Sequence, residues 1–139
     1  MDSEAAVFKV LSDPTRLRLS VLLSLRAEIC VCELAQAIGV PDFKISRHLS
    51  IMRAAGLVEA RREGTWMFYR LSAARTRLEE RLLGCLRECL ADHPTVQSDL
   101  KRLSGTTCEQ CEQREAPLHE KPEEPTLSLP AAEAAVQAP

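Results

Sequence analysis

Two short helical patterns, separated by a glycine and a proline, constrain the fold of this chain more than any other feature of its sequence. Apolar residues share one face of the first pattern: Leu34, Ala35 and Ile38. Apolar residues recur at the i, i+4, i+7 spacing in the second: Ile45, Leu49 and Met52. Gly39 ends the first helix, Pro41 restarts the chain, and Gly56 stops the second helix. Two short helices joined by a tight turn that contains glycine are typical of a helix-turn-helix.

The segments before this unit are predicted to be helical as well. Residues 4–11 are mostly apolar and favour a short helix. Asp13 is a good N-cap, and Pro14 suits the first helical position, so a second helix begins there. Its apolar residues continue to about Leu25, which makes this helix a candidate for the centre of the core.

A β-hairpin is predicted after the helix-turn-helix. Residues 58–62 and 65–71 favour strands on either side of Glu63-Gly64, which is a hairpin turn signal. With that turn, apolar side chains gather on one face of the hairpin: Val58, Ala60, Met67, Tyr69 and Leu71.

The last predicted elements are helical. Ser72 can cap a long helix that reaches about Ala91, and a shorter helical piece follows Pro94 over residues 96–103. The predicted fold class is therefore mainly α with a small β-hairpin. It is a winged helix-turn-helix with the element order α-α-α-α-β-β-α, formed by residues 1–105.

Residues 106–139 differ in composition from the rest of the chain. They contain five prolines, seven acidic residues and two basic residues, a net charge of −5. Since the whole chain carries −2, residues 1–105 carry +3. Few large apolar residues and many charges predict a disordered, acidic tail. A mildly basic domain in front of it is compatible with nucleic-acid binding.

Cysteine usage depends on the compartment, which the sequence predicts to be the cytoplasm. No apolar run approaches the roughly 18 residues that cross a bilayer, so no membrane association is expected. The acidic start, Met1-Asp2-Ser3-Glu4, does not resemble a signal peptide. In the cytoplasm the six cysteines are expected to be reduced. They are then metal ligands, redox sensors or buried apolar residues rather than structural disulfides.

Five motifs between residues 4 and 90 resemble those of the ArsR/SmtB repressors, in the same order and spacing. The motifs are Asp13-Pro14-Thr15-Arg16, Cys30-Val31-Cys32-Glu33-Leu34, Ile45-Ser46-Arg47-His48-Leu49, Ala55-Gly56-Leu57-Val58 and Arg62-Glu63-Gly64. The resemblance implies a homodimer paired through its N- and C-terminal helices. The cysteine motif resembles in particular that of the arsenical-resistance repressors, which release operator DNA when As(III) or Sb(III) binds.

Cys30 and Cys32 are the leading candidate ligands, because thiolates favour soft, thiophilic ions. In a helix, residues i and i+2 point about 200° apart around the axis. Binding one ion through both sulfurs therefore requires non-helical backbone, and an ion is expected to pull or unwind the first turn of the helix that follows. In the alternative interpretation both cysteines are packing residues of the core.

One position departs from the family's pattern. The arsenical repressors carry a third cysteine three residues after the second, where this chain has Ala35. A trivalent ion that prefers three sulfurs must find its third ligand elsewhere or bind with two. Cys108 and Cys111 in the tail are the candidates. A single Cys-x-x-Cys pair is also compatible with an incidental or buffering role, since a structural zinc site needs four ligands.

Cys85 and Cys89 lie four residues apart on the apolar stripe of the long helix, so they face the same way. The main interpretation places them in the dimer interface. In the alternative they form a second sensing site together with His93, one turn further along.

The second helix of the helix-turn-helix is expected to enter the major groove of double-stranded DNA. Four polar residues of that helix are the predicted base or phosphate contacts: Lys44, Ser46, Arg47 and His48. Arg61 and Arg62 of the hairpin are expected to contact the phosphate backbone. A two-fold dimer implies an inverted-repeat operator, with recognition helices about 34–36 Å apart.

The sequence thus predicts a dimeric, metalloid-responsive repressor of an arsenic-resistance operon, with no organic cofactor. The nearest rival keeps the fold and replaces the inducer by an oxidant or reactive sulfur species. A thiol-disulfide oxidoreductase that uses the tail cysteines has no supporting fold pattern. No paired carboxylates, Ser-His-Asp pattern or phosphate-binding loop indicates another enzyme. A structural zinc protein without a sensing role is the third alternative.

Overall fold

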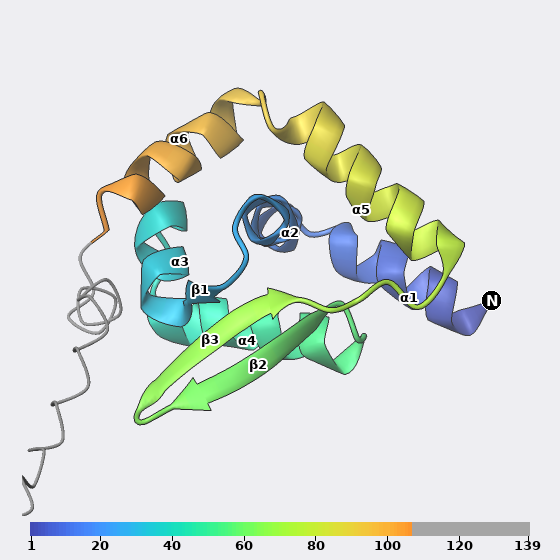
Figure 1. Cartoon of the computed structure of the whole chain (residues 1–139), viewed down its shortest axis with the longest axis horizontal. Helices are drawn as coiled ribbons and strands as arrows, with labels where there is room; N and C mark the ends of the chain where they lie inside the picture. Colours follow the sequence, from blue (N-terminus) through green and yellow to red (C-terminus); the bar gives the residue numbers. More distant parts are fainter. Residues whose placement is uncertain (107–139) are drawn as a thin grey trace, which may run out of the picture.

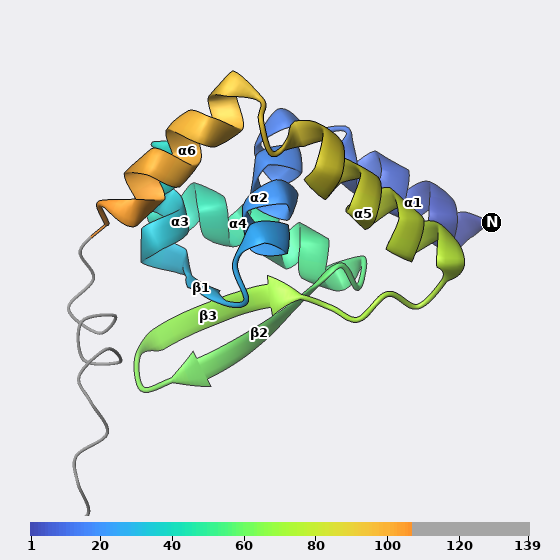
Figure 2. The ribbon, with the colours of Figure 1, turned by 45° about the horizontal axis from the view of Figure 1, so that its top comes forward.

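The computed structural model describes residues 1–106 of the chain. The elements of this part follow in the order α1 (Asp2–Leu11), α2 (Pro14–Leu25), β1 (Ile29–Cys30), α3 (Val31–Ile38), α4 (Asp42–Ala54), β2 (Val58–Glu63), β3 (Trp66–Leu71), α5 (Arg77–Leu90) and α6 (Pro94–Ser104). Helix α2 lies in the middle, with α3 and α6 on one side of it and α1 and α5 on the other (Figures 1 and 2). The hairpin of β2 and β3 projects beside α4 as the wing.

The helix boundaries follow from local chemistry. Asp13 caps α2 by accepting a hydrogen bond from the Arg16 backbone N–H at 3.1 Å, with Pro14 at the first helical position. Gly39 ends α3 with a φ of 76°, a left-handed conformation that favours glycine. The helix-turn-helix of α3 and α4 is confirmed.

The predicted start of α5 is wrong. Thr76, and not Ser72, caps the helix, and its hydroxyl accepts a hydrogen bond from the Glu79 N–H at 3.2 Å. The backbone N–H of Ser72 instead donates to the Leu57 carbonyl at 2.9 Å, which continues the pairing of the hairpin past its last strand residue. Because that N–H is held by Leu57, the residue before β2, the chain stays extended after β3 and the helix begins later.

The sheet has three antiparallel strands in the order β1-β3-β2, one more than predicted. The extra strand, β1, has two residues and is too short to leave a period in the sequence. The hairpin turn is also displaced by one residue, because Glu63 pairs with Trp66 and leaves Gly64 and Thr65 as the turn. Gly64 has a φ of 60°, and a positive φ at the first turn position favours glycine. The predicted faces hold, since Val58 is opposite Leu71 and Ala60 is opposite Tyr69.

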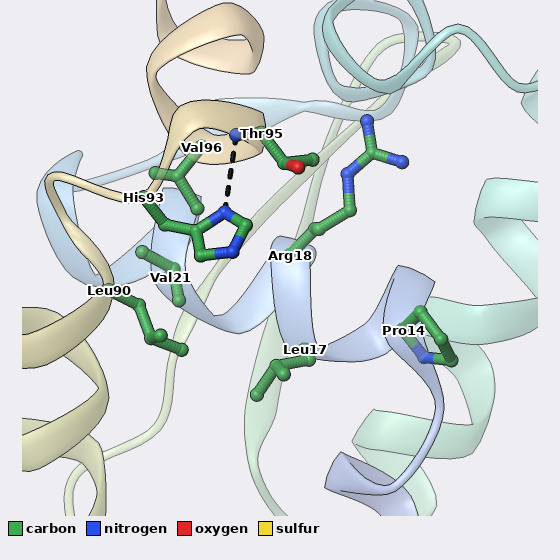
Figure 3. Close-up of a pocket in the computed structure, with 8 residues that line it drawn as sticks. All are labelled: Pro14, Leu17, Arg18, Val21, Leu90, His93, Thr95 and Val96. Atoms are coloured by element: carbon green, nitrogen blue, oxygen red, sulfur yellow. Dashed lines mark hydrogen bonds between the residues drawn. The ribbon is translucent and has the colours of Figure 1, made fainter.

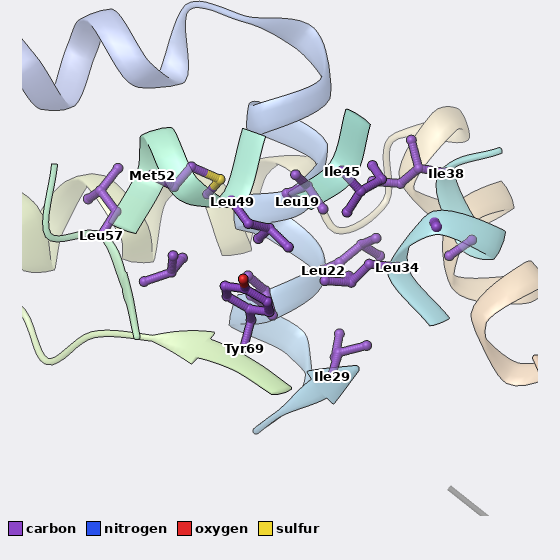
Figure 4. Packing of buried hydrophobic residues seen from close by; sticks show 14 of the residues in the cluster. Leu19, Leu22, Ile29, Leu34, Ile38, Ile45, Leu49, Met52, Leu57 and Tyr69 are labelled. Atoms are coloured by element: carbon purple, nitrogen blue, oxygen red, sulfur yellow. The ribbon is translucent and has the colours of Figure 1, made fainter. Parts of the chain in front are cut away.

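The main core fills the space between α2, the helix-turn-helix and the inner face of the sheet (Figure 4). Side chains from every one of these elements are buried there: Leu19, Leu22, Ile29, Leu34, Ile38, Ile45, Leu49, Met52 and Tyr69. Truncating one such leucine to alanine costs about 2–5 kcal/mol, so this core fixes how α4 sits against the rest of the molecule.

Helix α6 is fastened to α2 and α3 by a buried carboxylate. Asp99 is 0% exposed and accepts hydrogen bonds from Arg18 at 2.6 and 2.8 Å and from Arg102 at 2.7 Å. The two arginines also donate to the last carbonyls of α3, Arg102 to Ala37 at 2.6 Å and Arg18 to Ile38 at 3.3 Å. We call these three side chains the Asp99 clamp.

Candidate metal centre and nucleic-acid interface

Cys30 and Cys32 lie at the junction between β1 and α3. Cys30 is the last residue of the strand and the N-cap of the helix, with an extended φ of −71° and ψ of 147°. Cys32 is in the first helical turn, and the two Sγ atoms are 3.2 Å apart. The required non-helical backbone is therefore present at Cys30. The strand-to-helix turn already brings the two sulfurs together, and the expected pull of an ion on the first turn of α3 stays a prediction.

The distance between the two sulfurs bears on the kind of ion they suit. Two sulfurs 3.2 Å apart subtend an angle of about 90° at an ion held by bonds of roughly 2.3 Å, the Zn–S length. A tetrahedral ion with the same bonds needs sulfurs about 3.8 Å apart. A trivalent ion with a lone pair has compressed, near-right angles. The two sulfurs are therefore close enough to share one ion.

The surroundings of the pair favour bound thiolates. Both sulfurs sit at the N-terminus of α3, where the helix dipole favours negative charge. The Cys30 backbone N–H donates to the Glu33 carboxylate at 3.3 Å, which ties the first turn of the helix to the strand end. Cys30 is buried and Cys32 is half-buried, so the pair combines shielding with a route of access.

The wing forms one wall of this site. Cys30 pairs with Phe68 across β1 and β3, and the two side chains share a small cluster on the outer face of the sheet. The Arg61 guanidinium covers the Phe68 ring at 4.9 Å and forms ion pairs with Glu28 at 2.7 Å and Glu63 at 3.0 Å. Arg61, predicted to contact DNA, thus lies between the wing and the cysteine pair.

A third sulfur is not found beside this pair among residues 1–106. That part of the chain contains no cluster of three or more His, Cys, Asp and Glu side chains able to hold a metal ion. Ala35, at the family's third cysteine position, is buried in the core. The candidate ligands Cys108 and Cys111, with nearly all of the predicted tail over residues 106–139, lie outside the described residues.

Cys85 and Cys89 form a second, different pair. They lie on α5, on the other side of α2 from α3, so they do not join the first pair (Figure 2). Their Sγ atoms are 3.8 Å apart, and both are exposed free thiols. The hydrogen bond with Cys85 raises the pKa of the Cys89 thiol, which disfavours the thiolate that an ion needs. His93, their predicted partner, accepts a hydrogen bond from the Thr95 N–H at 3.2 Å.

A largely apolar cavity lies near the turn between α5 and α6, and its lining does not form a metal centre. This cavity of about 200 Å³, open to solvent on one side, lies between α2, the end of α5 and the start of α6 (Figure 3). It is lined by Pro14, Leu17, Arg18, Val21, Leu90, His93, Thr95 and Val96. Its one charged wall residue, Arg18, is held by Asp99. The lining offers a hydrocarbon surface and one imidazole, which is no ligand set.

The polar residues predicted to contact DNA occupy two environments. Lys44, Arg47 and Arg62 are exposed, whereas Ser46 and His48 are half-buried on the flanks of α4. His48 Nδ1 lies 3.4 Å from Arg16 Nη1 and 3.9 Å from Asp13 Oδ1, which ties α4 to the start of α2. Burial raises the pKa of Asp13, but the Arg16 N–H and the nearby charges of Arg16 and His48 outweigh it, so this carboxyl stays ionised. All the DNA roles remain predictions.

One residue of α4 was missed in the sequence. Phe43 is 72% exposed, whereas the same helix buries Ile45, Leu49 and Met52 and leaves Ile51 39% exposed. The signal was available, because Phe43 is four residues before Arg47 and two before Ile45. In a helix these spacings put it beside the arginine and away from the core.

Comparison with known proteins gives a consistent result. Residues 13–60 match the family model described as bacterial regulatory protein, arsR family. The chain is 36% identical over 102 residues to the arsenical resistance operon repressor of Escherichia coli, covering 73% of this chain and 86% of that one. It is 49% identical over 65 residues to an arsenic resistance transcriptional regulator of Pseudomonas putida, spanning 47% of this chain and about half (51%) of that protein.

Solved structures agree with the fold. A homodimeric winged helix-turn-helix DNA-binding domain from Mycobacterium bovis superposes with a TM-score of 0.54 at 33% identity, covering 67% of this chain and 82% of that one. This neighbour confirms the predicted winged helix. The named relatives are transcriptional regulators and not enzymes, as predicted for this chain. Within residues 1–106, no helix has the length and apolar character needed to cross a membrane. On its sequence relatives and its fold, the chain belongs to the arsR family of bacterial regulatory proteins.

Proposed function

We propose that this protein is a dimeric repressor that binds the operator of an arsenic-resistance operon and releases it when As(III) or Sb(III) binds Cys30 and Cys32. The observation that carries the proposal is the 3.2 Å separation of the two sulfurs at the start of the helix-turn-helix. The named functions of the Escherichia coli and Pseudomonas putida relatives support the choice of arsenic as the inducer.

The site is connected to both predicted DNA-contacting parts. Cys30 belongs to β1, which pairs with the wing strand β3, and Cys32 belongs to α3, which packs against α4. An ion that draws the sulfurs together or apart therefore changes the position of the wing relative to the recognition helix. An inducer weakens DNA binding only by preferring the arrangement that DNA does not, and such couplings are typically about 5–150-fold.

The third ligand is proposed to come from Cys108 or Cys111. Helix α6 packs against α3 through the Asp99 clamp and through buried Leu103, and these contacts set where the tail leaves the domain. Cys108 follows two residues after Thr106, the last residue of the described part. A tail sulfur that completes the ion's shell would also link α6 to the cysteine junction.

Dimer formation is proposed to use α1 and α5. In the described part of the chain, α5 buries only Glu79, and Leu78 on α5 and Phe8 on α1 are 39% and 51% exposed. The Mycobacterium bovis neighbour is homodimeric. We expect a two-fold dimer of this kind to bind an inverted-repeat operator. Its proposed location is the cytoplasm, where the DNA lies.

The sulfur separation also supports one rival. An oxidant or polysulfide that accepts two electrons would join the two Sγ atoms in a disulfide with loss of two protons, and the inducer would then be reactive sulfur rather than arsenite. The two inducers can be distinguished by the redox conditions, since arsenite binds thiols under reducing conditions and an oxidant does not act there.

The proposal is tested by arsenite-dependent release of operator DNA, followed by fluorescence anisotropy with a phosphine reductant that does not compete as a dithiol. We expect wild type to release DNA, and Cys30→Ser and Cys32→Ser to bind DNA without responding. Cys108→Ser/Cys111→Ser should raise the arsenite concentration needed. A full response in both single variants excludes this site. Polysulfide is tested in a parallel titration from which the phosphine has been removed, because a phosphine consumes polysulfide and reduces disulfides; release there, with no release by arsenite, favours the rival.

A further inference from the structure

The recognition helix carries a large apolar side chain that the fold does not use. Phe43 is the second residue of α4 and is 72% exposed, whereas Phe68, the nearest comparable residue of the wing, is 2% exposed. A single exposed phenylalanine is not unusual by itself. Phe43 is a candidate contact because it lies in the first turn of α4, the part of such a helix that meets base edges.

The position of Phe43 on the helix identifies the side from which that contact comes. Taking about 100° per residue, Phe43 and Arg47 lie within about 40° of each other and close to 180° from Ile45, which is 0% exposed. Ser50 and Ala54 continue the same exposed line along the helix. The face opposite the core therefore begins with a phenyl ring and continues with a guanidinium.

The charges around the ring indicate a polyanion. Lys44 and Arg47 flank Phe43 and are exposed, and neither forms an ion pair within residues 1–106. Asp42, the first residue of α4, is the one acid in this turn. In helix-turn-helix proteins the N-terminal residues of the second helix contact base edges, which is the place Phe43 occupies.

We propose that Phe43 determines operator sequence by packing against the 5-methyl group of a thymine in the major groove. A phenyl ring neither donates nor accepts a hydrogen bond, so it cannot read the amino and carbonyl groups of the bases. The thymine methyl is the one apolar group that the major groove presents. This inference rests on the proposed DNA-binding function and adds to it the base that this helix selects.

The proposal separates Phe43 from its charged neighbours. Lys44 and Arg47 add affinity through phosphates or guanine, in a salt-dependent manner. The Phe43 contact is apolar, so its contribution should be independent of salt and should disappear when a single methyl group is removed from the DNA.

The test uses the full-length protein and a binding site selected by wild type from a random duplex pool. Each thymine of a half-site is then replaced by deoxyuridine, which removes only the methyl group. We expect one position per half-site at which wild type loses about fourfold, or about 15-fold with both half-sites changed. Phe43→Ala removes both contacts of the dimer, so it should bind the selected site about 15-fold more weakly. It should be insensitive to deoxyuridine at that position.

Ile51→Ala is the matched control, because Ile51 is an exposed apolar residue on the far half of the same helix, 39% exposed. It should keep the full deoxyuridine effect. Equal sensitivity of wild type and Phe43→Ala at every thymine overturns the proposal, and so does a changed oligomeric state of Phe43→Ala in sedimentation, which would assign the ring to a protein contact. If wild type selects no sequence at all, DNA recognition itself fails. If wild type selects a site without any methyl dependence, only the Phe43 contact fails.

Discussion

The two cysteine pairs of this chain show why proximity of thiols is not enough for a sensor. Cys85 and Cys89 are one turn apart inside α5, and an ion or bond that joins them holds a helix that is already formed. Cys30 and Cys32 are two residues apart across the boundary between β1 and α3. An ion that joins them acts on a junction between two elements, each of which contacts a different predicted DNA-binding part.

The two pairs also differ in how their helices are held. The C-terminal end of α3 is fixed by the Asp99 clamp. We therefore expect a displacement of its cysteine end to move α3 against α4 and not to be taken up by a shift of the whole helix. Helix α5 is anchored near its start, where Glu79 binds Arg75, and its cysteines lie beyond that anchor on an exposed face. The comparison predicts that disturbing each anchor has a different consequence for sensing.

The largest effect is expected from Asp99→Ala. Asp99→Ala removes the hydrogen bonds that Arg18 and Arg102 donate to this buried carboxylate, while both partly exposed arginines keep their bonds to the α3 carbonyls. The free energy of unfolding should fall by about 2–4 kcal/mol. Urea unfolding measures this. Glu59→Ala, which breaks the exposed pair with Arg70, is the control and should cost less than about 1 kcal/mol. A small loss for Asp99→Ala would mean that α6 does not fix α3.

The next effect compares the pairs directly. Cys30→Ser/Cys32→Ser should lose the whole arsenite response, a coupling free energy of about 1–3 kcal/mol, whereas Cys85→Ser/Cys89→Ser should keep it. Arsenite titration of the protein–operator complex measures both. If the α5 variant also loses the response while remaining dimeric in sedimentation, α5 carries a second sensing site and the contrast between the pairs is wrong.

A smaller effect is expected for the α5 anchor as the pH falls. Hydrogen bonds from Arg75 lower the pKa of buried Glu79 below its usual 4.5, despite the opposing effect of burial. The folded state therefore binds this proton less readily than the unfolded state, so the stabilisation is present above about pH 4.5 and is lost as the pH falls through the folded pKa. As the pH falls from 5 to 3, the free energy of unfolding should decrease less in Glu79→Gln than in wild type. The difference should be about 1 kcal/mol, because the partner arginine is half exposed. Thermal unfolding across this range measures it, and an unchanged arsenite response at pH 7 is expected.

The smallest effect distinguishes the two wing arginines. Both arginines are exposed, but Arg61 forms ion pairs with Glu28 and Glu63. Arg62 forms no ion pair within residues 1–106, and its Nε donates to the Gly64 carbonyl at 3.2 Å. Arg62→Ala should reduce the slope of log affinity against log salt by about one per half-site. Arg61→Ala should leave this slope nearly unchanged. It should alter arsenite affinity slightly, because the substitution uncovers the Phe68 ring beside Cys30. Equal salt slopes in the two variants would place both arginines in the same role.

The helix-turn-helix could be predicted from the sequence because its signals are local. The i, i+4, i+7 spacing of Ile45, Leu49 and Met52 and the stop at Gly39 depend only on helix geometry and on the conformational freedom of glycine. The start of α5 could not, because Ser72 and Thr76 are both good caps. The choice between them depends on the hydrogen bond from Ser72 to Leu57, which exists only once the hairpin has formed.

The candidate site divides in the same way. The cysteine motif marked Cys30 and Cys32, but helix geometry alone predicted that their sulfurs diverge. They converge because Cys30 pairs with Phe68 in a two-residue strand, and a strand of that length has no period to detect. The position of Arg61 over Phe68 likewise needs two strands in register.

By itself, the sequence determined the winged helix, the reactive residue types and the face of α4 turned to the core, since caps, turns and hydrophobic period act within a few residues. The tertiary structure decided which of these residues meet. It brought the two sulfurs to 3.2 Å, placed the wing beside them and fastened α3 through Asp99. The physical reason is that each of these outcomes depends on packing or pairing between elements that lie far apart in the chain.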